Sequence, residues 1–183
     1  MHTIHNDYVN LGIRTFMIQR FKYILPVFLF LVLTACFKKE EYPVEPVIVF
    51  DRFTITGDSA RLSLEFTDGD GNIGLRDDQV APPYDPASFY HYNLYIEYWE
   101  KQDGAGWQPG RTPQGDTIVF KYRIKPFTTS EKDEPVKGIL EVLVEPVYYN
   151  PFSTDNDTIK YKITLIDRDL HLSNKLETQE IIR

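Results

Sequence analysis

Apolar and polar residues alternate along short segments of this chain, and this period of two is the strongest constraint on its fold. The clearest example is residues 60–66, where Ala60, Leu62, Leu64 and Phe66 alternate with polar residues. Successive side chains of a strand point to opposite faces, whereas an amphipathic helix repeats every 3.6 residues. The segment is therefore predicted to be a half-buried β-strand.

The same alternation recurs further along the chain, and no segment shows a convincing helical period. Seven strands are predicted, over residues 47–55, 60–66, 90–100, 117–127, 137–144, 159–166 and 176–182. Glycine, proline and aspartate mark turns between these segments. Seven short strands without helices predict an all-β fold, a single antiparallel β-sandwich.

The N-terminal segment has a different character. A short apolar run, residues 23–33, follows Arg20 and Lys22, and it is shorter than the roughly 20 apolar residues that a membrane-spanning helix needs. Basic residues before such a run are typical of a signal peptide. The run leads into Leu33-Thr34-Ala35-Cys36, which holds the one cysteine of the chain and resembles the lipobox of bacterial lipoproteins.

The lipobox resemblance implies that residues 1–35 are a signal peptide that is removed, and that acyl chains such as palmitate on Cys36 anchor the protein in a membrane. Several acyl chains hold a protein far more firmly than one. Residues 1–16 look like no part of an export signal, so Met17 is an alternative start. A core helix with a free thiol is the less favoured alternative, because small residues precede the cysteine.

The residues that follow Cys36 are charged. Two lysines and then two glutamates occupy positions 38–41 and resemble the signal that sends Bacteroidetes lipoproteins to the outer face of the outer membrane. A solvated tether would have the same composition. Residues 36–46 are predicted to be the lipidated tether, extended by two prolines, and residues 47–183 to be one domain.

Net charge limits the partners of this domain. The chain has a net charge of −7, and without residues 1–35, which hold three basic and one acidic residue, the net charge becomes −9. The phosphate backbone would repel such a surface, and no basic stripe is present, so nucleic acid is excluded as a partner. Acidic character favours solubility and the binding of cations.

Residues 36–183 resemble the immunoglobulin-like or fibronectin-like domains of Bacteroidetes surface lipoproteins. Two stretches carry the resemblance: residues 64–74, where a strand runs into an aspartate–glycine loop, and residues 166–178. In such domains the second stretch links the last two strands. The resemblance implies an immunoglobulin-like sandwich on the outer membrane, exposed at the cell surface, without an assigned activity.

The loop Asp68–Gly74 is the best candidate metal site. Calcium takes six to eight oxygen ligands, and acidic or amide residues at alternate positions let a tight loop point several oxygens inward. The EF-hand spacing begins in the same way but fails at Ile73 and Gln79, where its glycine and its closing glutamate would fall. The predicted ligands are Asp68, Asp70, Asn72 and Asp78, joined by Asp167 and Asp169 if the two loops meet. The alternative is a plain turn whose aspartates bond their own backbone.

Aromatic residues outside the predicted strands are candidates for ligand binding. Trp107 near a hairpin tip, and Tyr148 and Tyr149 in a loop, are predicted to contact a glycan or a protein partner. Catalysis is not expected, because the proximity of His171 to Asp169 in the sequence does not make a catalytic triad. The sequence therefore favours a non-enzymatic binding or accessory module. A structural subunit of an outer-membrane assembly and a metal-dependent hydrolase are the alternatives.

Overall fold

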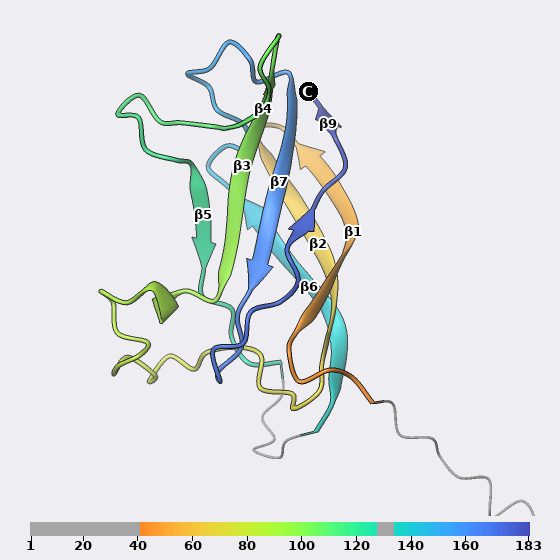
Figure 1. Ribbon diagram of the computed structural model, residues 1–183, viewed down its shortest axis with the longest axis vertical. Coiled ribbons are helices and arrows are strands. Elements are labelled where there is room, and N and C mark those ends of the chain that lie inside the picture. The colour runs from red at the N-terminus through yellow and green to blue at the C-terminus, as the bar shows by residue number, and fades with distance from the viewer. Residues whose placement is uncertain (1–40, 128–133) are drawn as a thin grey trace, which may run out of the picture. The chain divides into compact units, whose positions relative to one another are not determined.

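The computed structural model describes residues 41–127 and 134–183, which fold into two antiparallel sheets packed face to face (Figure 1). This β-sandwich confirms the all-β class predicted from the alternation. The predicted signal peptide, Cys36 and the first part of the predicted tether lie outside the described residues. Within the described ranges, no helix is long and apolar enough to cross a bilayer.

The first sheet has three strands in the order β1-β2-β6. They are β1 (Val47–Thr56), β2 (Ser59–Asp68) and β6 (Val136–Val144). Strand β2 lies at the centre, and its four alternating apolar residues, Ala60, Leu62, Leu64 and Phe66, are at most 1% exposed. The pairing of β1 with β2 shifts between Phe50 and Arg52, so both Phe50 and Phe53 pack against the core.

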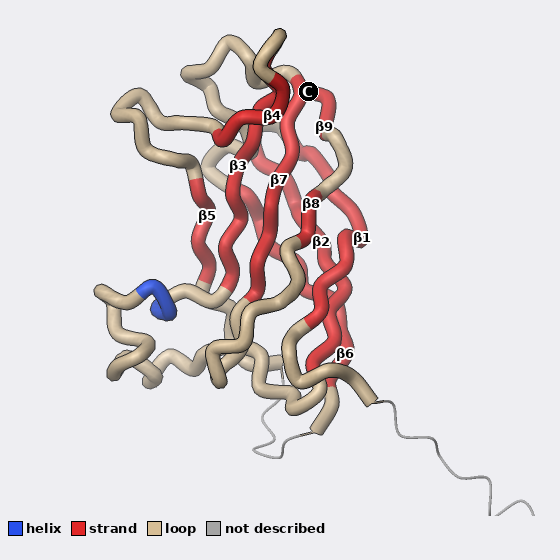
Figure 2. Tube along the Cα trace, in the orientation of Figure 1, coloured by secondary structure: helices blue, strands red, loops and turns tan. Residues whose placement is uncertain are grey.

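The second sheet has β3 (Leu94–Gln102) and β7 (Thr158–Leu165) at its centre. Two short strands share each of its edges (Figure 2). Along β3 these are β5 (Val119–Tyr122) and β4 (Gly106–Pro109), and along β7 they are β8 (Leu176–Glu177) and β9 (Ile181–Ile182). Each edge of this sheet is thus made of two short strands, so the described part of the chain has nine strands where seven were predicted.

The distribution of strands between the two sheets is that of an immunoglobulin-like sandwich. Strands β1, β2 and β6 occupy the places of strands A, B and E, while β3, β7 and the β8–β9 edge occupy those of C, F and G. The predicted antiparallel β-sandwich is therefore confirmed, with this order of strands. It places the end of β2 and the end of β7 at the same end of the sandwich (Figure 1).

The predicted strand 90–100 begins later than expected. A single 3₁₀ turn, η1 (Phe89–His91), precedes β3, and Ser88 caps it by accepting a hydrogen bond from the Tyr90 N–H to its Oγ at 3.0 Å. A serine side chain that satisfies a free N–H group in this way favours the start of a helical turn over a strand. His91 consequently lies in this turn and not in β3.

The core between the sheets is filled by branched aliphatic and aromatic side chains. Tyr98, Tyr161 and Phe66 are the largest fully buried residues. The Tyr161 hydroxyl donates a hydrogen bond to the Tyr148 carbonyl oxygen, and burial raises the pKa of Tyr161 far above its ordinary value. Apolar residues therefore fill most of the space between the sheets.

Candidate functional site

Two loops at one end of the sandwich bring most of the predicted metal ligands together. The Asp68–Gly74 loop follows β2, and residues 167–171 follow β7. The Asn72 Nδ2 group donates a hydrogen bond of 3.1 Å to Asp169 Oδ2, across 97 positions of sequence. Ligand atoms of Asp70, Asp167 and His171 all lie within 4.8 Å of one another. The two loops therefore meet, as a shared site requires.

Asp68 is the most enclosed residue of this cluster, since its exposed fraction is 0%. Its Oδ2 atom accepts a hydrogen bond of 2.8 Å from the Asn72 N–H, whereas its Oδ1 atom has no hydrogen-bond partner among the described residues. Burial, followed by the charge of Asp70, raises the pKa of Asp68 to about 7, although the Asn72 and Ile73 N–H groups oppose the rise. A plain turn accounts for the hydrogen bond to Oδ2, but it does not account for the burial of Oδ1 without a partner among the described residues.

Asp167 and His171 form a pair within the second loop. The two Asp167 oxygens face the His171 N–H and the His171 Nδ1 atom, each at 2.8 Å. Burial raises the pKa of Asp167, while the hydrogen bonds from His171 oppose the rise. The same contact raises the pKa of His171. Nδ1 is occupied by this contact, so the imidazole is fixed in orientation.

Tyr84 supports the second loop, and nothing in the local sequence pattern predicted this role. Its hydroxyl donates a hydrogen bond to the Arg168 carbonyl oxygen. Burial, followed by the negative charge of Asp169, raises the pKa of Tyr84. The long segment 69–88 therefore contributes to this end of the sandwich through a residue far from the aspartates of its first turn.

Asp78, the fourth predicted ligand, lies apart from the grouping of Asp70, Asp167 and His171. Its carboxylate pairs with Arg76 Nε at 3.2 Å, and its side chain is 77% exposed. Between the Asp68–Gly74 loop and Asp78, the backbone is fixed to another segment, because the Leu75 N–H donates a 2.8 Å hydrogen bond to the Ile124 carbonyl oxygen. The structure thus places Asp78 in a surface ion pair.

The chain enters the domain at this same end. The Gly69 N–H donates a hydrogen bond of 2.8 Å to the Pro43 carbonyl oxygen, and Pro46 is buried. Part of the predicted tether, residues 43–46, is therefore attached to the domain beside the Asp68–Gly74 loop.

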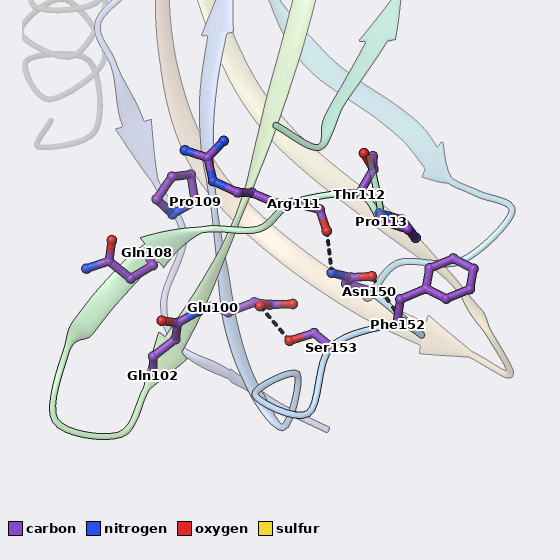
Figure 3. A pocket seen from close by; sticks show the side chains of 10 residues that line it. All are labelled: Glu100, Gln102, Gln108, Pro109, Arg111, Thr112, Pro113, Asn150, Phe152 and Ser153. Atoms are coloured by element: carbon purple, nitrogen blue, oxygen red, sulfur yellow. Dashed lines mark hydrogen bonds between the residues drawn. The ribbon is translucent and has the colours of Figure 1, made fainter. Parts of the chain in front are cut away.

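The opposite end of the sandwich holds a cavity of about 500 Å³ (Figure 3). Most of its lining is polar, and the lining residues are Glu100, Gln102, Gln108, Pro109, Arg111, Thr112, Pro113, Asn150, Phe152 and Ser153. Glu100 is only 2% exposed, and its Oε2 atom accepts a 2.8 Å hydrogen bond from Ser153 Oγ. Asn150 Nδ2 donates a 2.9 Å hydrogen bond to the Arg111 carbonyl oxygen. The cavity therefore has an ordered polar base.

The predicted ligand-binding aromatics lie around this end but differ in exposure. Tyr148 is 4% exposed and belongs to the core. The Trp107 ring faces the Lys160 ammonium group at 4.6 Å, and the Tyr149 ring faces the Arg183 guanidinium group at 3.8 Å. Phe152, by contrast, is 76% exposed and lines the cavity. It is the aromatic residue of the predicted loop that a ligand can reach directly.

Comparisons of the chain with models of known families, with curated proteins and with solved structures find no match.

Proposed function

We propose that the protein is a non-enzymatic binding module, a lipoprotein anchored in the outer membrane through Cys36 and exposed at the cell surface. The observation that carries this proposal is the polar cavity at the end of the sandwich remote from the entry of the chain. Residues 43–46 enter the domain beside the Asp68–Gly74 loop, so the cavity lies at the end of the domain remote from this entry. A position far from the anchor suits a site that meets ligands outside the cell.

The lining of the cavity favours a neutral saccharide as ligand. Glu100 and Arg111 are its two charged residues and balance each other, so the cavity has no net charge with which to select an ion. Gln102 and Gln108 offer amide groups that both donate and accept hydrogen bonds, as sugar hydroxyls require. The exposed ring of Phe152 offers an apolar face for stacking on a sugar ring. A cavity of this size falls within the range of small-molecule sites.

Replacing Phe152 by alanine is expected to weaken saccharide binding about fivefold, because loss of one stacking contact costs on the order of 1 kcal/mol. Phe89→Ala is the matched control, because Phe89 is also exposed, at 57%, but does not line the cavity. Saturation-transfer NMR of the purified chain with methyl glycosides of neutral hexoses and N-acetylhexosamines measures the binding. Saturation transfer to none of these sugars, or equal losses in both variants, would contradict the proposal.

The anchor is tested separately in cells. Substitution Cys36→Ser is expected to abolish incorporation of labelled palmitate and to release the protein from the membrane fraction, because the cysteine sulfur carries the first acyl chains. Protease treatment of intact cells is expected to degrade the wild-type protein. Labelling that survives the substitution would disprove the anchor, and protection from protease would place the domain inside the cell envelope.

A structural role in an assembly is the second candidate, and one observation favours it. Among the described strands, β6 pairs with β2 alone and forms an edge of its sheet, and it exposes Ile139 at 55% and Leu143 at 39%. An open edge with apolar side chains can pair with a strand of another chain. Lys137 and Glu141 interrupt this edge, so the binding role is the better supported of the two.

A further inference from the structure

We propose that the loops 68–74 and 167–171 enclose a calcium ion, bound by side-chain oxygens of Asp68, Asp70, Asn72 and Asp167. The ion would join the end of β2 to the end of β7 and so connect the two sheets. This site lies at the opposite end from the saccharide cavity, and the proposal does not depend on that function.

The two loops concentrate negative charge. Asp68, Asp70, Asp167 and Asp169 place four carboxyl groups in two adjoining loops. Among the ion pairs between described residues, none joins Asp68, Asp70 or Asp169 to a lysine or an arginine. Arg168 is close by, but its Nε group donates to the Asn72 carbonyl oxygen at 2.9 Å. Asp68 and Asp167 are buried, and buried charges are normally paired or bound to a metal. A divalent cation would supply positive charge to these two groups and to the less buried Asp70 and Asp169.

Two buried side-chain oxygens of the first loop lack hydrogen-bond partners among the described residues. Asp68 Oδ1 and Asn72 Oδ1 are buried and accept no hydrogen bond from any residue of the ranges 41–127 and 134–183. Asn72 is 7% exposed, and its Nδ2 group contacts Asp70 Oδ2 at 2.9 Å and Asp169 Oδ2 at 3.1 Å. The side-chain oxygen Oδ1 of Asn72 belongs to the same amide group as Nδ2, so it also lies near the carboxylates of both loops. Unsatisfied buried acceptors are rare in folded proteins, and here two of them border the same acidic cluster.

The chemistry of the donors selects calcium. All four proposed ligands are hard oxygens, which calcium accepts in flexible geometry with six to eight ligands, completed by water or backbone carbonyls. Zinc favours nitrogen and sulfur ligands, and none of the four proposed ligands offers either. Magnesium requires a near-ideal octahedron and retains several waters, which suits an enclosed pair of loops less well.

Calcium binding is tested by titration calorimetry and thermal melting of the purified full chain at mildly alkaline pH. At about a hundredfold excess over the dissociation constant, calcium is expected to raise the melting temperature by roughly 10 °C relative to EDTA. The double substitution Asp68→Asn/Asp70→Asn keeps the side-chain shapes and is expected to weaken calcium affinity at least a hundredfold. The matched control is Asp77→Asn/Asp78→Asn, which removes two carboxylates from exposed surface ion pairs of the same segment and is expected to bind calcium as the wild-type protein does.

Each outcome decides the proposal. Absence of calcium binding to the wild-type chain, or equal binding to the two double variants, would overturn it. Zinc binding that exceeds calcium binding and requires His171 would overturn the choice of calcium and indicate a nitrogen-containing site. Because saccharide binding is read at Phe152, a negative result for calcium leaves the test of the cavity unaffected.

Discussion

Without divalent cations and at about pH 8, substitution Asp68→Asn is expected to increase the free energy of unfolding by up to about 4 kcal/mol. The buried carboxyl group has a pKa of about 7 in the folded protein instead of 3.8. At alkaline pH the wild-type fold must therefore hold a buried, poorly solvated charge. Asparagine keeps the acceptor for the Asn72 N–H at 2.8 Å and removes that charge, so the fold becomes more stable.

The same pKa determines how the wild-type protein responds to pH. Between pH 3.8 and about 7 the folded state retains a proton on Asp68 that the unfolded chain has lost. The free energy of unfolding therefore decreases as pH rises through this window and stays low above it. The raised pKa values of Asp167 and His171 act in the same direction. Asp68→Asn is thus expected to flatten the profile in large part, but not completely.

Urea unfolding in EDTA between about pH 5 and about pH 8 measures this difference. Asp77→Asn is the control, since Asp77 pairs with Lys125 at the surface, with a side chain 76% exposed, and its removal should leave the profile unchanged. If Asp68→Asn follows the wild-type profile at every pH, Asp68 is solvated and does not carry the unfavourable charge.

Local alternation was sufficient to predict the central strands of the fold. In β2 and β7 every second residue is apolar and fully buried, because each strand has one face toward the core. The edges were harder to predict. The segment 176–182 reads as one strand, but it pairs with β7 at two separate places, Leu176–Glu177 and Ile181–Ile182. Such interruptions depend on the partner strand, which local sequence does not specify.

The candidate sites show a similar division between local and non-local information. The Asp68–Gly74 pattern predicted oxygen ligands. Asp167 and Asp169 were predicted as further ligands only if the two loops lay close together. Only the order of the strands brings the two loops together, since the residues in contact are 97 positions apart. The cavity around Glu100 was not predicted, because its wall comes from three separate segments. The loop that ends in Phe152 was the one local signal for it.

Gly71 gives the second large prediction, because substitution Gly71→Ala is expected to destabilise the protein by about 3 kcal/mol or more. Gly71 has a φ of +69°, and an added Cβ would lie 2.1 Å from the Glu134 carbonyl oxygen. The left-handed backbone costs an alanine about 1–2 kcal/mol. The overlap adds a further cost, since two backbone segments must separate to relieve it. Urea unfolding of the variant measures the sum.

Gly57→Ala separates the two costs. Gly57 has a similar φ of +60°, but an added Cβ would have nothing within 4 Å. This control is expected to lose only the backbone term of about 1–2 kcal/mol. Equal losses in the two variants would mean that the Asp68–Gly74 loop does not pack against residue 134. A larger loss at Gly71, accompanied by weaker calcium binding in that variant alone, would show that the glycine holds the loop closed while the neighbouring carboxylates face the ion.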